Sequence, residues 1–286
     1  MEVIDKPLGR LRPRRPLLAA ALMVALLAGC ASRVGVPLSS ERIAAIVASP
    51  DRSAADRNND VRRKPTDMLA FVGVIPGMVA LDLSAGGGYT TELLARAIGP
   101  TGRVYGQNVP RDAANPPRQP LAPEGNTAPA PAAAPAATPL VRRTLANRAA
   151  SPATSNIIPV LRKFEDPIPP ELKPGTLDLA TLMFNYHDLG YQGVDRAQMN
   201  KAVFAALKPG GLYVIADHSG RPGTGISESG TLHRIEEAFL RKEIESAGFR
   251  FAGEGSFLRN PNDPRDKNTP EPPQPKDEFV LKFVKP

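Results

Sequence analysis

The stretch at residues 78–108 reads MVALDLSAGGGYTTELLARAIGPTGRVYGQN and decides the fold. It begins with a short apolar run typical of a buried strand, continues through three glycines, and then places leucine and alanine at helical spacing. Gly99 and Pro100 end the helical pattern, and residues 103–106 favour a second strand. The stretch therefore predicts a strand, a helix and a strand, with a glycine turn after the first strand. Such a turn lets a ligand approach the backbone and faces it with the N–H groups of a helix start.

The spacing of the glycines distinguishes two classes of ligand. A dinucleotide-binding turn requires the pattern G-x-G-x-x-G, and Thr91 stands where its third glycine would be. The stretch instead resembles motif I of class I S-adenosylmethionine (SAM) dependent methyltransferases, D-x-G-x-G-x-G, at residues 82–88, with Ser84 in place of the first glycine. The resemblance continues at residues 207–213, LKPGGLY, a turn that commonly precedes the fifth strand of that family. Two family motifs in the right order, inside alternating strands and helices, make the resemblance specific.

The rest of the chain alternates between predicted helices and strands. We expect helices at 39–48, from Pro65, and at 140–150, 195–207 and 232–247, and strands at 157–163, 177–184, 212–216, 249–258 and 278–284. The resemblance implies that residues 65–286 form a methyltransferase-like domain with a Rossmann-like α/β fold. That fold is a seven-stranded, mostly parallel sheet with helices on both faces and an antiparallel last strand. More specifically, the chain is similar to exported bacterial proteins described as predicted methyltransferases.

Residues 1–29 resemble a bacterial signal peptide of the lipoprotein type. Five basic residues precede an apolar run at residues 17–28, which is too short to span a bilayer as a helix. Cys30 follows Leu-Ala-Gly, which resembles a lipoprotein box in which the cysteine receives lipid after cleavage. We therefore expect a periplasmic protein anchored by lipid to a bacterial membrane, the outer membrane by preference; an ordinary signal peptide or a buried helix is the alternative. Because Cys30 is the only cysteine, no disulfide can form within the chain.

Two further segments differ in composition from the predicted sheet and helices. Residues 30–64 are expected to form a tether and N-terminal helices, and their charged part, residues 53–64, has the composition of a solvated helix surface. By analogy with similar methyltransferases, Arg63 and Lys64 could meet an anionic ligand. The segment at about residues 110–139 contains 9 prolines and 10 alanines without an aromatic residue, so we expect a disordered insertion.

Polar side chains follow each predicted parallel strand, at the edge where open α/β sheets bind ligands. They are Asp82 and Ser84 after the first strand, Gln107 and Asn108 after the second, Glu165 and Asp166 after the third, Asn185, Tyr186, His187 and Asp188 after the fourth, and Asp217 and His218 after the fifth. His233 lies near the start of the following helix, so all three histidines of the chain fall near this edge. A single histidine is more often structural than catalytic, but three around one rim favour a functional site.

The family resemblance implies SAM as the cofactor. The glycine turn would receive its methionine moiety, with helix-start N–H groups facing the carboxylate. The amides after the second strand stand where the family usually has an acidic residue for the ribose hydroxyls, and the acids after the third strand match a residue that often contacts the adenine amine. The residues that we assign to the cofactor are Asp82, Ser84, Gly86, Gly87, Gly88, Gln107, Asn108, Glu165, Asp166, Asn185 and Tyr186.

Methyl transfer is an in-line displacement at a sulfonium carbon, so the protein chiefly aligns the acceptor and excludes water. For a hydroxyl or protonated amine acceptor a base must remove a proton, and we predict His187 or His218 in that role, with Asp188 or Asp217 as the orienting carboxylate. A divalent ion held by His, Asp and Asn after the fourth and fifth strands is an alternative. No tight metal motif such as HExxH is present, so we predict no metal.

The expected function is therefore SAM-dependent methyl transfer to a small-molecule acceptor, which the sequence does not identify. The formal net charge of +7 comes without a basic stripe interleaved with aromatic residues, so no nucleic-acid partner is predicted. The competing hypothesis is a non-catalytic exported binding protein that uses the fold for another ligand or partner, because SAM is made in the cytoplasm. The sequence makes no prediction of the oligomeric state.

Overall fold

The computed structural model describes residues 1–2, 35–110, 144–268 and 274–286. The chain divides into two compact units, Met1–Val34 and Gly35–Pro286, and the structure presented below is that of the second. Cys30 and the predicted signal peptide beyond its first two residues lie outside the described residues, as does the predicted insertion apart from Pro110. None of the described helices combines the length and the apolar character that crossing a membrane requires.

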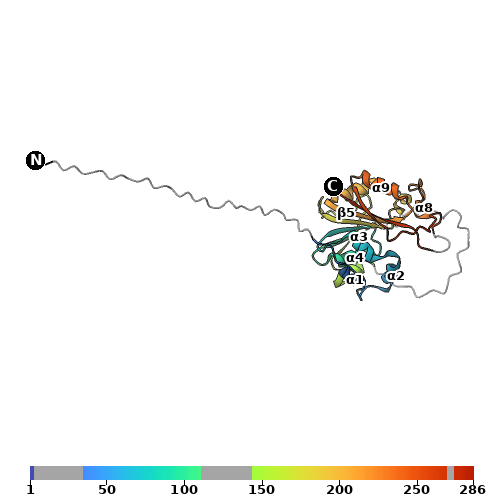
Figure 1. Ribbon diagram of the computed structural model, residues 1–286, viewed down its shortest axis with the longest axis horizontal. Helices are drawn as coiled ribbons and strands as arrows, with labels where there is room; N and C mark the ends of the chain where they lie inside the picture. The colour runs from blue at the N-terminus through green and yellow to red at the C-terminus, as the bar shows by residue number, and fades with distance from the viewer. Residues whose placement is uncertain (3–34, 111–143, 269–273) are drawn as a thin grey trace. The chain divides into compact units, whose positions relative to one another are not determined.

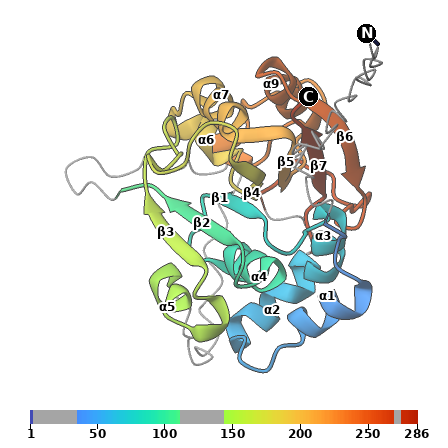
Figure 2. The ribbon, with the colours of Figure 1, turned by 90° about the vertical axis from the view of Figure 1, so that its left-hand side faces the viewer.

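Seven strands form one sheet in the order β3-β2-β1-β4-β5-β7-β6, which can be followed in Figure 2. Figure 1 shows the same sheet from another direction, with β5 labelled. They are β1 (Val79–Leu83), β2 (Arg103–Asn108), β3 (Ile157–Leu161), β4 (Leu177–Met183), β5 (Leu207–His218), β6 (Arg250–Gly255) and β7 (Glu278–Val284). The first five strands pair in parallel, and β7 runs antiparallel to both β5 and β6. The predicted Rossmann-like sheet with its antiparallel last strand is confirmed.

Helices cover both faces of this sheet. They are α1 (Ser40–Val47), α2 (Ala54–Arg63), α3 (Pro65–Val72), α4 (Tyr89–Ile98), α5 (Leu145–Ala149), α6 (Asp188–Gln192), α7 (Arg196–Ala206), α8 (Ser229–Leu232) and α9 (Glu237–Ser246), with a short 3-10 turn at Pro152–Thr154. One apolar cluster joins the sheet to α1, α3, α4 and α5, and a second joins it to α6, α7 and α9. Figure 2 shows the same two layers of helices. Successive residues of β5 alternate between the clusters, as a strand buried on both faces requires.

The chain changes its direction across the sheet at β1. From β1 it passes through α4 to β2 and on to β3, whereas β4 and β5 lie on the other side of β1. The glycine turn after β1 therefore stands where neighbouring connections diverge to opposite faces. Open α/β sheets bind their ligands at this position.

β5 is longer than the strand that the sequence predicts at residues 212–216. Leu177 of β4 pairs with Leu207, but Leu179 pairs with Leu212. Residues 208–211 are therefore a bulge within one strand, and Gly210 reaches a φ of 78° there. The second family motif thus forms an irregularity inside β5 instead of a turn that precedes it.

The helix predicted at residues 232–247 is wrong in its first part, where the structure has the short helix α8, a break, and then α9. In the break, Ile235 forms a parallel bridge with Ser219 after β5. The buried guanidinium of Arg234 pairs with Asp263 at 2.8 Å. These tertiary contacts hold the backbone out of the helix, and helical spacing of apolar residues carries no information about them.

The charged segment at residues 53–64 forms α2. Arg57, Arg62 and Lys64 are exposed, as its composition predicts, but Asp56 is buried and Asp60 is partly buried. Arg52, just before the helix, is 4% exposed and donates to both carboxylate oxygens of Asp60, at 2.7 and 2.8 Å. Asp56 is 3% exposed and forms an ion pair with Arg148 at 2.8 Å. The prediction fails for these charges because the buried partner of Asp56 comes from a distant part of the chain.

Arg148 joins three parts of the structure. Besides Asp56 of α2, its guanidinium contacts Glu92 of α4, and the three side chains are at most 4% exposed. Its Nε also donates to the carbonyl oxygen of Gly87 in the glycine turn, at 2.6 Å. The guanidinium makes four hydrogen bonds to these three groups, whereas an ammonium has only three donors.

Replacing Arg148 with lysine should therefore lower the free energy of unfolding by about 2–4 kcal/mol, because at least one buried carboxylate loses its partner. Chemical denaturation followed by circular dichroism measures the change. Arg162→Lys is the matched control, since Arg162 pairs with an exposed carboxylate, Asp166, and such a surface pair contributes at most about 1 kcal/mol. Equal losses in both variants would contradict the bridging role of Arg148.

Candidate functional site

A cavity of about 480 Å³ lies at the carboxyl ends of β1 and β4. Its walls come from α2, the glycine turn, the start of α4 and the residues that follow β4. Its lining includes Asn59, Arg63, Asp82, Ser84, Gly86, Gly87, Tyr89, Thr90, Phe184 and Asn185. A cavity of this size is in the range that small-molecule ligands occupy.

The glycine turn consists largely of left-handed backbone. Ser84, Gly86 and Gly88 have φ values of 54°, 55° and 84°. At Gly88 space also excludes a side chain, because a Cβ would lie 2.8 Å from Leu145 and 2.9 Å from Arg148. Gly88, the N-cap of α4, has no side chain to cap the helix, so the N–H groups of Tyr89 and Thr90 are left to face a ligand, while that of Thr91 is directed at Asp82.

The two amides after β2 hold the glycine turn in shape. Gln107 is fully buried; its Oε1 accepts from the Ser84 N–H at 2.9 Å and its Nε2 donates to the carbonyl oxygen of Arg162 at 2.6 Å. Asn108 accepts from the Gly86 N–H at 2.8 Å and donates to the Gly86 carbonyl oxygen at 3.0 Å. These are the residues that the family resemblance implies for the ribose, and the structure engages both with the protein's own backbone.

Asp82 lies beneath the turn and is 1% exposed. Its carboxylate accepts from the hydroxyls of Thr91 in α4 and Thr181 in β4, at 2.6 and 2.7 Å. Burial raises the pKa of Asp82 to about 6, although both hydroxyls act against the rise. The carboxylate therefore joins two strands and a helix at the floor of the cavity.

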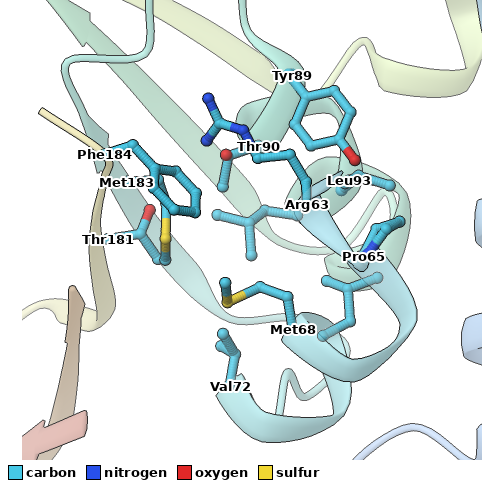
Figure 3. A pocket seen from close by; sticks show the side chains of 12 residues that line it. Arg63, Pro65, Met68, Val72, Tyr89, Thr90, Leu93, Thr181, Met183 and Phe184 are labelled. Atoms are coloured by element: carbon cyan, nitrogen blue, oxygen red, sulfur yellow. The ribbon is translucent and has the colours of Figure 1, made fainter. Parts of the chain in front are cut away.

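Arg63 stands between two aromatic rings at the cavity (Figure 3). Its guanidinium carbon lies 4.0 Å from the ring centroid of Phe184 and 5.8 Å from that of Tyr89. No residue in the described ranges forms an ion pair with it, whereas the neighbouring Arg62 pairs with Glu278 at 2.7 Å. Burial and the charge of Arg62 lower the pKa of Arg63 to about 10, so it stays cationic at neutral pH. A small apolar recess below it shares the same two rings.

The structure brings the three histidines together at the same edge of the sheet, although none of them lines the cavity. The ring centroid of His187 lies 5.2 Å from that of His218 and 5.5 Å from that of His233. Two carboxylates flank His187: its Nδ1 lies 2.6 Å from Asp217 Oδ1, and its Nε2 lies 2.9 Å from Asp188 Oδ1. The predicted catalytic residues are therefore neighbours in space.

These carboxylates determine the charge of His187. Burial lowers the pKa of His187, but Asp217 and Asp188 outweigh burial and raise the pKa to about 9. Burial likewise raises the pKa of Asp188, but hydrogen bonds from His187 and His233 bring it below its usual value. At neutral pH, His187 is an imidazolium between two carboxylates.

His218 differs from its neighbour. Burial lowers the pKa of His218 well below its usual range, and the charge of Lys276 adds to this. Its Nδ1 lies 3.0 Å from Glu278 Oε1, but in a direction unsuited to a hydrogen bond, and it has no hydrogen-bond partner among the described residues. Its ring centroid lies 5.8 Å from that of Phe184, at the cavity wall.

Six predicted cofactor residues do not line the cavity. Gly88, Gln107 and Asn108 belong to the glycine turn or hold it, whereas Glu165, Asp166 and Tyr186 lie elsewhere. Tyr186 is fully buried in the apolar cluster under α7 and α9, where its hydroxyl donates to Glu243 at 2.9 Å. Glu165 accepts from the N–H of Asp195, just before α7, and Asp166 is 65% exposed. The residues after β3 thus belong to a different part of the surface.

Sequence reasoning misses several residues of the site. Tyr89 and Thr90 directly follow the glycines, so their position at the start of a predicted helix is a usable signal. Asn59 and Arg148 carry no such signal, because only the fold brings them to the cavity. Arg148 hydrogen-bonds the turn from 61 residues further along the chain.

Asp82 makes the stability of the fold depend on pH. Its pKa is higher in the folded state, about 6, than the usual 3.8, so the folded protein binds more protons between these values. The contribution of the protonated Asp82 to the free energy of unfolding is therefore present below about pH 4. About 3 kcal/mol of stability is lost as the pH rises from there through about 6. Asp82→Asn keeps the shape and removes the buried charge.

The difference in free energy of unfolding, Asp82→Asn minus wild type, should accordingly increase by an amount on the order of 2–3 kcal/mol as the pH rises from 4 to 7. Urea denaturation of both proteins at several pH values measures this difference. If the difference in free energy of unfolding between the two proteins stays constant over this range, burial does not raise the pKa of Asp82.

No protein-family model and no curated protein matches the sequence. Among solved structures, the chain is similar to one chain of a Haloferax volcanii complex between the methyltransferase activator Trm112 and a protein described as a methyltransferase. The TM-score is 0.53, with 18% identity over 87% of this chain and 99% of that chain. It is also similar to a SAM-dependent methyltransferase from Aquifex aeolicus (TM-score 0.48, 16% identity, 86% and 98% covered). An arsenic(III) S-adenosylmethionine methyltransferase from Chlamydomonas reinhardtii gives a TM-score of 0.49 with 16% identity (85% and 72% covered). With its sheet order and its similarity to the Haloferax volcanii structure, the chain has the Rossmann-like methyltransferase fold.

Proposed function

We propose that this protein is a SAM-dependent methyltransferase that acts on a small-molecule acceptor. The observation that carries the proposal is the cavity at the glycine turn, where an uncapped helix start and the cation of Arg63 border one space. The fold shared with the Haloferax volcanii protein supports the same function.

The lining of the cavity suits the parts of SAM. The carboxylate would meet the N–H groups at the start of α4 and the guanidinium of Arg63, since both favour negative charge. Asn59 offers an amide to the ribose hydroxyls.

The residues at the ends of β1 and β2 would serve the cofactor indirectly. Asp82, Gln107 and Asn108 hold the backbone of the turn, so they would keep its N–H groups in place instead of contacting SAM themselves. Because Glu165 and Asp166 do not line the cavity, the proposal does not use them for the adenine.

SAM, when bound, supplies an activated methyl group, and the residues of the chain would align the acceptor and exclude water. His218 is our candidate for removing a proton from the acceptor, because its Nδ1 has no hydrogen-bond partner among the described residues. Both nitrogens of His187 face carboxylates instead. Asp217 would orient the pair, because it accepts from the His187 ring and from the backbone N–H of His218.

Calorimetric titration of the wild type with SAM and with S-adenosylhomocysteine should show binding of both. Arg63→Met should weaken both affinities by about tenfold or more, because the carboxylate loses a charge-assisted partner. Arg57→Met is the matched control: Arg57 lies on the same helix, is exposed, and donates to the Ser49 carbonyl oxygen outside the cavity.

Affinities that are equal in the two variants would show that Arg63 does not face the cofactor. If the wild type binds neither SAM nor S-adenosylhomocysteine, the methyltransferase proposal is refuted, and the cavity would have to bind a different small ligand.

We further propose that the protein is exported and carries lipid on Cys30, which would place it at a bacterial membrane. The support is the sequence at residues 1–30, a basic segment, an apolar run and Leu-Ala-Gly before the cysteine. Cys30→Ser should move the protein from the membrane fraction to the soluble fraction, while Ser32→Ala should leave it with the membrane. Mass spectrometry of the mature wild type should find a chain that begins at a lipid-modified Cys30; an unmodified cysteine would refute the proposal.

A further inference from the structure

We propose that His187, Asp188 and His233 form a binding site for a divalent transition-metal ion of the Zn²⁺ class. One ligand atom of each residue lies within 4.8 Å of the other two. Asp188 Oδ1 stands between the imidazoles, 2.9 Å from His187 Nε2 and 2.8 Å from His233 Nδ1. The sequence favours a metal-free site, but it does not show that His233 joins the residues after β4. The inference does not depend on the proposed methyl transfer.

The identity of the donor atoms selects the class of ion. Two imidazole nitrogens and one carboxylate oxygen are ligands that Zn²⁺ and its first-row neighbours prefer. Mg²⁺ and Ca²⁺ take sets of oxygen ligands instead, so the site does not suit them. Three protein ligands leave a fourth position of a tetrahedral ion for water or another small ligand.

A second layer of contacts fixes the ligands as metal sites require. Asp217 is fully buried, and its Oδ1 lies 2.6 Å from His187 Nδ1, so the other ring nitrogen is directed toward Asp188. The other oxygen of Asp217 accepts from the backbone N–H of His187 at 2.8 Å. Asn185 donates to Asp188 Oδ2 at 2.9 Å, which leaves Oδ1 for the ion. A carboxylate on the outer nitrogen of a ligating histidine is the usual arrangement in zinc sites.

His233 is held in place by its neighbours in the chain. Its backbone adopts the left-handed conformation, with a φ of 52°, which costs free energy for a residue other than glycine. The next two residues are fastened independently: Arg234 is fully buried and pairs with Asp263, and Ile235 bridges to Ser219 at the end of β5. This strained backbone directs the imidazole at Asp188, and such strain is found preferentially at functional sites.

The cluster has room and access for an ion. In a tetrahedral site with bonds of about 2.0–2.1 Å, the ligand atoms lie about 3.3 Å apart, so Asp188 Oδ1 and the imidazoles would separate by about half an ångström. The ion would replace the protons that these groups now share, and those protons would be released to solvent. The side chains of Asp188 and His233 are 18% and 23% exposed, so solvent reaches two of the three ligand residues.

The test is a calorimetric titration with ZnCl₂ of the full chain, purified without a polyhistidine tag and treated with a chelator beforehand. We expect one Zn²⁺ per chain. His233→Ala should weaken the affinity by at least about 100-fold, and Asp217→Asn, which alters only the outer layer, by about 10–100-fold. Circular dichroism of each variant confirms that it is folded, and the absorption spectrum of the Co²⁺-loaded wild type reports a tetrahedral nitrogen and oxygen environment that His233→Ala should lose.

Two controls use the other groups that could bind zinc. His218→Gln changes the remaining histidine of the chain, and Cys30→Ser removes the only thiol; both should leave the Zn²⁺ affinity unchanged. The inference is overturned if the wild type binds no zinc or if folded His233→Ala binds it equally well. It is also overturned if either control variant abolishes binding, because the site would then lie elsewhere. None of these readouts uses SAM, so failure here and failure of the proposed function are distinguishable.

Discussion

The buried carboxylate of Asp82 is the constraint on which the rest of the site depends. It accepts from one hydroxyl in α4 and one in β4, so it joins β1 to α4 and to β4 at the edge of the sheet where the glycine turn lies. It is 1% exposed, and this burial raises its pKa. The glycine turn begins two residues later, and the cavity takes its floor from this junction.

Local sequence was enough to predict β1, the glycine turn, α4 and β2, because the residues that form them lie within one short stretch. The antiparallel last strand followed from the family resemblance and not from any pattern in the residues. The buried charges of α2 and the break before α9 could not be predicted, since they depend on the pairs Asp56–Arg148 and Arg234–Asp263. Each pair joins residues that no local pattern connects.

The site was predictable in outline for a similar reason. The carboxyl ends of parallel strands share one edge, so the histidines that follow these strands were correctly predicted to lie close together. The same rule cannot tell which way a side chain points: His187 meets two carboxylates, whereas Tyr186, one residue earlier, turns into the apolar core. Gln107 was placed at the right strand end but faces the backbone of the turn. Side-chain direction and backbone partners are properties of the fold.

One feature of the glycine turn bears on how the chain tolerates the long segment between β2 and α5. Asn108, the last residue of β2, binds Gly86, and Arg148 in α5 binds Gly87. The chain therefore leaves the turn at one glycine and returns to it at the next. Both contacts with the glycine turn lie outside the segment that joins β2 to α5, so the shape of the turn does not depend on the length of that segment.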